Sequence, residues 1–164
     1  MPKIAIYPGT FDPPTLGHVN LVERGLSVFD KIIVAIAHNP GKSCLFTVDE
    51  RLELLRRSLS NLPLERVEVD FFEGLTVDYA KKKGAGAILR GLRVLADFEF
   101  EFQLAMVNRH LSQDVQSVYL MADLQSLFIS SSTVKEAASH GADVGDLVPA
   151  PVAESLKRKF SREA

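Results

Sequence analysis

A glycine- and proline-rich segment near the N-terminus carries residue types that bind phosphate groups. The segment Pro8–His18 reads PGTFDPPTLGH and follows a short apolar run. Gly9 lets the backbone approach a ligand closely, and the consecutive prolines stiffen the loop. Gly17 and His18 fall in the first turn of a predicted helix, where free backbone N–H groups and the helix dipole favour an anion. We therefore predict that His18 donates a hydrogen bond to a phosphate oxygen.

The other histidines help to judge this interpretation. A single histidine is more often an exposed or packed polar residue than a ligand, but the strand–turn–helix context of His18 favours the ligand role. His38, His110 and His140 lack that context and are interpreted as surface or structural residues. Other nucleotide signatures are missing from the sequence, which has neither a P-loop nor a GxGxxG pattern after its first strand. No Cys/His cluster predicts a zinc site.

Basic and hydroxyl-bearing residues follow three further predicted strands. Lys42 follows the second strand, and Arg90 and Arg93 follow the fourth. Arginine side chains match phosphate oxygens bidentately. After the fifth strand, the hydroxyls of the run Ser130–Thr133 and the free N–H groups of the next helix suit a phosphate. Taken singly, these residues would be a solvated lysine, loop arginines and a helix cap, but their shared place after strands favours an anion site.

Alternating strands and helices are predicted to position these residues. Apolar, β-branched runs predict strands at 3–7, 31–37, 67–72, 87–89 and 115–121. Helical periodicity and stop signals predict helices at about 16–29, 47–59, 76–83, 96–111, 132–140 and 151–160. Thr47 with Glu50, and Thr133 with Glu136, are typical of capping boxes in which the threonine is the N-cap.

The segment 98–102, which reads FEFEF, is ambiguous because its alternation has the period of a strand. On a helix, Phe98, Phe102 and Arg109 would share one face, and no glycine or proline interrupts 96–111. We predict a helix.

The alternation of strands and helices predicts an α/β fold with an open, five-stranded parallel sheet and helices on both faces. No linker or repeat divides the 164 residues, so we predict a single domain over 1–164. In such sheets ligands bind outside the carboxyl ends of the strands. Functional residues are therefore expected just after positions 7, 37, 72, 89 and 121.

Composition excludes several classes of protein. Apolar residues make up 46% and charged residues 24%, which is ordinary globular usage and not that of disordered or collagen-like chains. The net charge of −2 argues against a nucleic-acid-binding surface, and no apolar run approaches the ~20 residues that span a bilayer. Cys44 is the only cysteine, so no internal disulfide forms. With no signal-peptide pattern at the N-terminus, we expect a cytoplasmic protein with no nucleic-acid or membrane partner.

Three motifs together resemble one enzyme family. Thr15–His18 (TLGH) resembles the (T/H)xGH signature of the nucleotidylyltransferase superfamily, and Ile129–Ser132 (ISSS) resembles its second signature. Arg90–Arg93 (RGLR), followed by ADFE and then by NRHL, narrows the resemblance to the bacterial phosphopantetheine adenylyltransferase family, from about residue 4 to 154. The resemblance implies a Rossmann-like fold, Mg²⁺ as cofactor and a homohexamer. The implied reaction converts ATP and 4′-phosphopantetheine to dephospho-coenzyme A and pyrophosphate, the penultimate step of coenzyme A synthesis.

The resemblance also implies a role for each matching residue. The expected catalytic residues are Thr10, His18, Lys42 and Arg90. The residues expected to bind 4′-phosphopantetheine are Thr10, Lys42, Thr76 and Arg90. The residues expected to bind ATP are Thr10, Phe11, His18, Gly91, Leu92, Arg93, Glu101, Ser126, Leu127, Phe128, Ile129, Ser130, Ser131 and Ser132. No protein ligand for a metal is predicted.

The chemistry suits these residue types. The acceptor phosphate is already an anion, so the attacking group needs no strong base, and positioning and charge neutralisation should carry catalysis. We expect direct in-line attack without a covalent enzyme intermediate. His18 and Lys42 are expected to hold the pentavalent centre, and the turn Ser130–Ser132 the pyrophosphate.

Two positions depart from the common pattern of the family. Many members carry Trp or Tyr where this chain has Ser126, and Tyr where it has Phe100. We expect Leu127 or Ile129 to supply an apolar contact to adenine, at some cost in ATP affinity. Activity is expected because the phosphate-handling residues are all present.

Two other functions remain open at this point. A sibling nucleotidylyltransferase would act on nicotinamide mononucleotide, or on glycerol phosphate with CTP, and the RGLR and ISSS sequences argue against both. A catalytically silent adenine-nucleotide sensor is supported only by the altered segment 122–126, whereas Thr10, His18, Lys42 and Arg90 oppose it. Pyrophosphate release with different acceptors distinguishes the three.

Overall fold

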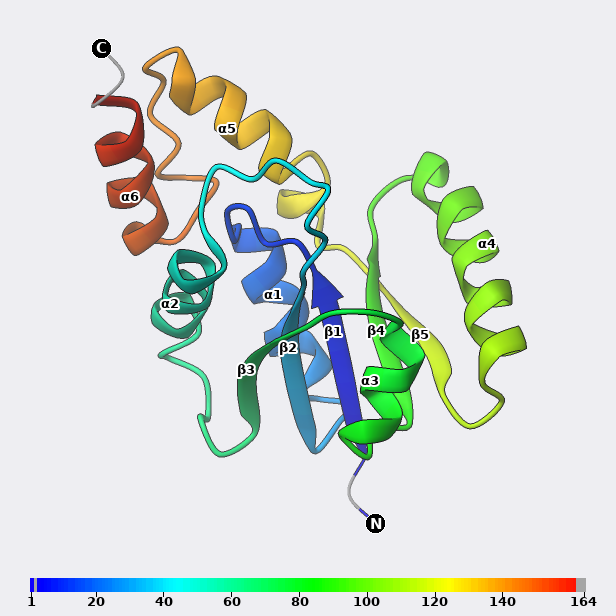
Figure 1. Cartoon of the computed structure of the whole chain (residues 1–164). Coiled ribbons are helices and arrows are strands. Elements are labelled where there is room, and N and C mark those ends of the chain that lie inside the picture. Colours follow the sequence, from blue (N-terminus) through cyan, green and yellow to red (C-terminus); the bar gives the residue numbers. More distant parts are fainter. Residues whose placement is uncertain (2, 162–164) are drawn as a thin grey trace.

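In the part of the chain that the structure describes, five strands form one open parallel sheet, in the order β3-β2-β1-β4-β5 (Figure 1). The computed structural model describes residues 1 and 3–161, except for the side chains of residues 95 and 96. The strands are β1 (Ile4–Gly9), β2 (Lys31–Ala37), β3 (Val67–Phe72), β4 (Ala87–Leu92) and β5 (Gln116–Met121). The predicted fold class is confirmed.

Among the described residues, six α-helices and one short 3₁₀ helix connect and follow the strands. They are α1 (Leu16–Gly25), α2 (Val48–Ser58), α3 (Thr76–Lys82), α4 (Leu95–Leu111), η1 (Leu124–Ser126), α5 (Ser131–Ser139) and α6 (Ala150–Ser161). The segment 98–102 lies inside α4, so the helix prediction is confirmed. Its strand-like alternation leaves phenylalanines exposed on the helix.

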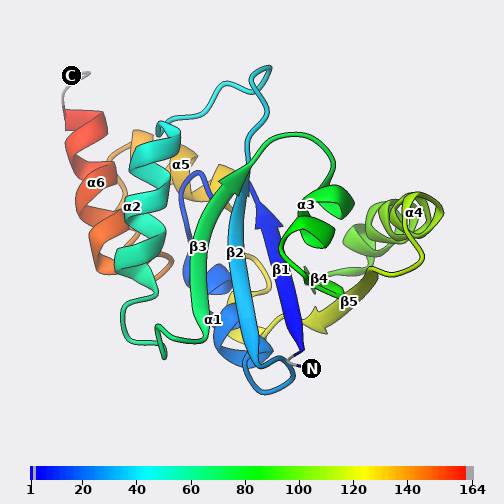
Figure 2. The same cartoon turned by 60° about the horizontal axis from the view of Figure 1, so that its bottom comes forward.

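The sheet buries both of its faces. Alternate residues of the central strands enter different apolar clusters, so that Ala5 packs on the side of α1 and α2 while Ile6 packs on the side of α3. Burial on both faces explains why β1 and β2 are apolar without interruption, as parallel strands usually are. Figures 1 and 2 show α1 and α2 on one side of the sheet and α3 and α4 on the other.

A third apolar cluster joins the C-terminal helices to α2. Leu54 of α2 packs with Val134 of α5 and with Val152 and Leu156 of α6. This packing places the N-terminus of α5 beside the carboxyl ends of the strands. Within the described residues, no helix is long and apolar enough to span a membrane.

Several predicted boundaries are wrong for identifiable reasons. β1 continues past Tyr7 to Gly9, because Pro8 and Gly9 stay paired with β2 after the pairing with β4 has ended at Ile6. A strand paired on one side tolerates proline. β4 continues past Leu89 because the next residues pair with β5.

Two helix ends also differ from the prediction. α1 ends at Gly25 and not near residue 29. The N-cap of α5 is Ser130, whose hydroxyl accepts the Thr133 N–H at 3.1 Å, so the predicted Thr133 cap is wrong. Ser130 and Thr133 both have capping side chains, and the helix begins at the earlier one.

Candidate active site

Three adjoining cavities lie at the carboxyl edge of the sheet. Cavity I, of about 390 Å³, extends from the end of β1 to α1, α4 and the start of α5. Cavity II, of about 620 Å³, lies between the ends of β1, β2 and β4 and the start of α3. Cavity III, of about 280 Å³, lies between the loop after β1, the loop after β2 and α5. Arg90 lines cavities I and II, Thr10 and Lys42 line II and III, and Ser131 lines I and III.

The predicted residues divide among these cavities. Cavity I contains His18, Gly91, Arg93, Glu101, Ser126, Ile129, Ser130 and Ser131, and it shares Arg90 with cavity II. Cavity II contains Thr10, Lys42 and Thr76, and Ser132 lines cavity III. Phe11, Leu92, Leu127 and Phe128 line none of the three. The fold therefore brings most of the predicted residues to one edge of the sheet, in three adjoining cavities.

His18 is held by the helix cap of α1. Thr15 is the N-cap, its hydroxyl accepts the His18 N–H, and its own N–H donates to His18 Nδ1 at 2.9 Å. This is a capping box in which histidine takes the usual place of glutamate. Because Nδ1 accepts a hydrogen bond, the proton of the neutral ring lies on Nε2. The cap thus makes Nε2–H a donor for the cavity.

The charge state of His18 follows from its surroundings. Burial, with Arg93 as a second cause, lowers the pKa of His18 to about 4. The ring is therefore neutral near pH 7. It can donate one hydrogen bond from Nε2, but it is too weak a base to serve as a proton acceptor there.

We predict that acid destabilises the protein through His18. The pKa is about 4 in the folded state against 6.5 in the reference state, so the unfolded chain binds more protons between these values. The stabilising contribution is fully present above pH 6.5 and is lost as the pH falls towards 4, by about 3 kcal/mol at most. Urea unfolding at several pH values measures it. The variant His18→Gln, whose amide also completes a capping box, should show a smaller pH dependence, and an equal dependence would contradict the prediction.

Phe11 fixes the ring of His18 from the other side. Its side chain is buried, and the ring lies edge-on to His18 at 4.9 Å and to Tyr7 at 5.3 Å between centroids. A Cβ atom on Gly9 would come within 2.9 Å of the Phe11 ring, so glycine is needed at that position. Phe11 has a φ of 49°, a left-handed conformation that is strained for a phenylalanine. The loop after β1 is therefore held in a conformation that Phe11 by itself does not favour.

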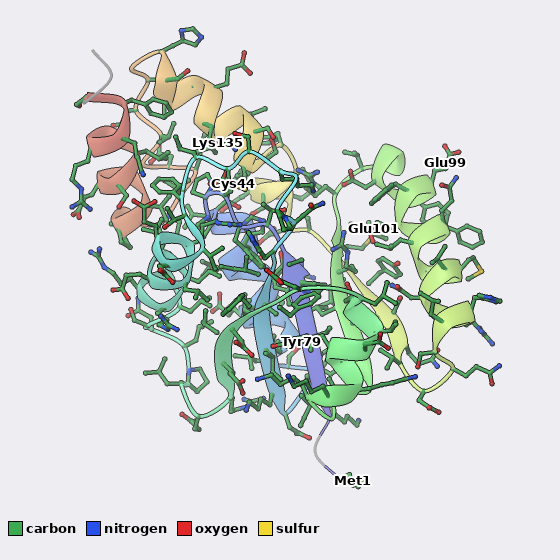
Figure 3. The ribbon with its side chains drawn as sticks, in the orientation of Figure 1. Met1, Cys44, Tyr79, Glu99, Glu101 and Lys135 are labelled. Carbon is green, nitrogen blue, oxygen red and sulfur yellow. The ribbon has the colours of Figure 1, made fainter. Side chains whose placement is uncertain are left out.

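Arg90 is oriented by an ion pair with Glu101. Its Nε lies 3.0 and 3.1 Å from the two carboxylate oxygens, and its Nη1 donates to the carbonyl of Pro8 at 3.2 Å. Glu101 belongs to α4 and is buried, and Figure 3 shows it on the side of α4 that faces the sheet. Nε, Nη1 and Nη2 each use one N–H, so two of the five donors of the arginine are left for an anion.

Arg93 has a similar support from α4 and the serine turn. Its Nε donates to Asp97 at 3.2 Å, and its Nη1 donates to the carbonyl of Ile129 at 3.0 Å. Ile129 is buried and lines cavity I. Arg93 thereby links the end of β4 to the residue that precedes the serines.

The turn Ser130–Ser132 at the start of α5 offers hydroxyl and backbone donors to cavities I and III. The Ser131 hydroxyl donates to the carbonyl of Pro13 at 2.8 Å, which joins the start of α5 to the loop after β1. Ser130 and Ser131 line cavity I, and Ser131 and Ser132 line cavity III. Free N–H groups at a helix start bind anions, so this turn suits an extended polyphosphate.

The segment before the serines lacks an aromatic side chain in cavity I. Ser126, at the end of η1, is buried there, and its Cβ would lie 3.6 Å from a Cβ on Gly17. Phe128 is 75% exposed and Leu127 half-buried, and neither lines the cavity. Of the two apolar residues that we expected to contact a base, only Ile129 borders the space.

Lys42 and Thr76 border cavity II from two separate segments. Lys42 is exposed in the loop between β2 and α2, and Thr76 begins α3. Apolar side chains from the sheet and α4, Phe72, Ile88 and Leu104, form another part of the wall. The cavity therefore combines a lysine and a threonine at one end with an apolar wall.

Three supporting residues were missed by the sequence reasoning. The Asp12 carboxylate accepts hydrogen bonds from the N–H groups of Leu45 and Phe46, and it pairs with Lys135. Arg51 is buried and donates to the carbonyl of Thr10 at 2.9 Å. No local pattern marks these contacts. The Thr15–His18 cap did have a signal, since Thr15 precedes His18 by the same three residues that separate Thr47 from Glu50.

Comparisons with known proteins show the family and the fold of this chain. A family model described as cytidylyltransferase-like matches residues 6–137. The phosphopantetheine adenylyltransferase of Desulfosudis oleivorans is 53% identical over 96% of this chain and 93% of its own length. That of Anaeromyxobacter sp. strain K is 51% identical over 99% of this chain and 98% of its own length.

A solved structure shares the fold. The bifunctional NMN adenylyltransferase/ADP ribose pyrophosphatase of Francisella tularensis superposes with a TM-score of 0.73 at 13% identity. The match covers 98% of this chain and 50% of that one. At this identity the likeness shows the fold alone.

Proposed function

This chain belongs to the phosphopantetheine adenylyltransferase family, and from that premise we propose that cavities I and II hold its two substrates. The enzyme is a nucleotidyltransferase of coenzyme A biosynthesis. Cavity I would take ATP, because the N-termini of α1 and α5 both open into it. Cavity II would take 4′-phosphopantetheine, whose arm suits the wall formed by Phe72, Ile88 and Leu104. The observation that carries the proposal is that Arg90 lines both cavities.

The acceptor phosphate would be held where the cavities meet. Arg90 donates three of its five N–H groups to Glu101 and Pro8, so two remain for the acceptor phosphate. Lys42 and Thr10 line cavity II together with Arg90. Thr76 would contribute at the start of α3. These donors would place a phosphate oxygen for attack on the α-phosphate of ATP, and positioning of this kind supplies much of the rate.

Charge stabilisation would then carry the transfer. The bond from the attacking oxygen to the α-phosphorus forms as the bond to the bridging oxygen of pyrophosphate breaks, in line and without a covalent enzyme intermediate. Nε2–H of His18 would donate to an oxygen of the pentavalent centre. The positive charge of Lys42 would offset the negative charge of that centre. Preorganised donors lower the barrier because they need not reorganise during the reaction. The turn Ser130–Ser132 would hold the leaving pyrophosphate.

Mg²⁺ would reach the site on the nucleotide. Among the described residues, no cluster of three metal-ligating side chains exists. The carboxylates that border the cavities, Asp12, Asp97 and Glu101, all pair with basic side chains. Mg²⁺ is commonly held by substrate phosphates and waters, and it supplies charge neutralisation there. The described residues do not make a protein-only magnesium site.

An acceptor comparison tests the proposed function. We expect pyrophosphate release from ATP with 4′-phosphopantetheine, and a product with the mass of dephospho-coenzyme A. Nicotinamide mononucleotide with ATP, and glycerol phosphate with CTP, should give release no faster than ATP alone. ATP binding without turnover on any acceptor would instead support a nucleotide sensor.

The exposed side of α4 supports an oligomer. Six apolar side chains of this helix are between 44% and 63% exposed: Phe98, Phe100, Phe102, Met106, Val107 and Leu111. An apolar patch of this kind is typical of an interface, and we propose that further copies of the chain cover it in a homohexamer.

A charge placed on α4 should break the assembly. Val107→Glu, at a side chain 54% exposed, is expected to yield particles smaller than the hexamer in light scattering. Val28→Glu makes the same change at a side chain 47% exposed, after α1, and should leave the mass unchanged. A wild-type monomer, or an unchanged mass of the α4 variant, would contradict the proposal.

A further inference from the structure

The carboxylate of Asp12 joins three segments that are far apart in the sequence. It is 3% exposed, in the loop after β1. Its two oxygens accept the N–H groups of Leu45 and Phe46 at 2.9 Å each, and Oδ2 also accepts from Lys135 Nζ of α5 at 2.8 Å. Burial alone would raise the pKa of this carboxyl, but the hydrogen bonds from Lys135 and the two backbone groups hold it below the usual range.

The segment that carries Lys42 depends on this carboxylate. The N–H of His38 donates to the carbonyl of Phe72, which fixes the start of the segment. Residues 39–44 are all described, and their hydrogen bonds, from Gly41 and Lys42 to Asn39, stay within the segment. The next attachment to another element is the pair of N–H groups that Asp12 accepts. The segment that carries Lys42 is therefore attached at two points, and Asp12 in the loop after β1 provides the second. Asp12 thereby helps to fix how far Lys42 lies from β1.

Lys135 supplies the charge that lets Asp12 stay ionised in this place. It borders cavity III together with Thr10, Lys42 and the serines. Figure 3 shows Lys135 and Cys44 beyond the carboxyl ends of the strands. Lys42 lines the same cavity, and Arg51 donates to the Thr10 and Thr47 carbonyls. Lys135 is the one that contacts the carboxylate.

We propose that Asp12 is a positioning residue that fixes Lys42 for the acceptor phosphate, and that Lys135 acts through it. The inference rests on the role proposed for Lys42. Two substitutions test it. Asp12→Asn replaces two acceptor oxygens by one acceptor and one NH₂ group, which cannot accept a backbone N–H. The lost charge-assisted bond should raise the KM for 4′-phosphopantetheine by roughly tenfold or more.

The second substitution keeps Asp12 and removes its cation. Lys135→Met should also raise the KM for 4′-phosphopantetheine, while the KM for ATP stays within about twofold; Lys135→Arg should restore the wild-type value. Lys159→Met is a matched control, because Lys159 is 33% exposed and pairs with Glu50 of α2 at 2.9 Å, against 30% and 2.8 Å for Lys135. The control should leave both KM values unchanged. Hydrogen exchange at the Leu45 and Phe46 amides should be faster in the Asp12→Asn variant.

The possible outcomes separate this inference from the proposed function. Lys42→Met, measured in parallel, should itself raise the KM for 4′-phosphopantetheine; if it does not, the role of Lys42 is wrong and the inference fails with it. If Lys42→Met raises that KM but Asp12→Asn and Lys135→Met do not, the inference alone is overturned. If Lys135→Met raised only the KM for ATP, Lys135 would be a nucleotide contact, and the inference about Asp12 and Lys135 would also be overturned.

Discussion

Replacing His18 with alanine should lower kcat by roughly 10²–10³-fold, the effect of removing one donor that serves the transition state. The physical reason is the tautomer that the helix cap imposes. Thr15 N–H occupies Nδ1, and a pKa of about 4 keeps the ring neutral near pH 7, so Nε2–H is a donor there. Steady-state rates of pyrophosphate release measure the loss.

Two further variants separate chemistry from folding. His18→Gln completes the capping box but does not place a ring N–H in cavity I, so it should lose activity while retaining stability. His140→Ala removes an exposed histidine at the end of α5 and should change neither. If His18→Gln recovered the wild-type kcat, the cap and not the Nε2 donor would explain the effect of alanine.

The pH profile of kcat gives an independent check on the same residue. A catalytic base with an ordinary histidine pKa would produce an inflection near pH 6.5. His18 should produce none there, because its pKa is about 4.

The fold was predictable where one local pattern decided the element. The runs at β2 and β3 are bounded by polar residues and turns, and both strands are found where they were predicted. α4 is a helix because no glycine or proline interrupts it. Its phenylalanines at 98, 100 and 102 are exposed, so their alternation does not reflect one buried face of a strand. The predicted strand ends were wrong where pairing with a neighbouring strand determines the end, as at Pro8 and Arg90. A strand continues as long as it stays paired with its neighbour.

The site was predictable to the level of residue types and positions after strands. Which partner each side chain takes was not, and the contacts of the loop after β1 are the clearest case, because their partners are separated by large distances in the sequence. Asp12 and Lys135 are 123 residues apart, and no period or spacing indicates such a contact. The resemblance assigned Glu101 to ATP, and in the structure its carboxylate holds Arg90; the ATP contact stays a prediction.

Replacing Arg90 with methionine should cost both activity and stability. Loss of the cation shared by the two cavities is expected to lower kcat/KM for 4′-phosphopantetheine by roughly 10²–10³-fold, by analogy with removal of one preorganised donor. The substitution also leaves the Glu101 carboxylate buried without its partner. Breaking a buried pair costs about 3–5 kcal/mol; because the Arg90 side chain is 25% exposed, we expect a loss of about 2–3 kcal/mol in the free energy of unfolding, measured with urea.

A double variant separates the two losses. In Arg90→Met/Glu101→Leu the buried charge is gone, and apolar replacement of a buried ion pair is often neutral or stabilising, so stability should return towards the wild-type value. Activity should not return, because no donor then faces the acceptor phosphate from β4. Glu101→Gln keeps Arg90 but loosens its orientation, so its main effect should be a higher KM. Recovery of activity in the double variant would mean that Arg90 serves the fold alone and that the acceptor phosphate is held by Lys42 and Thr10 without it.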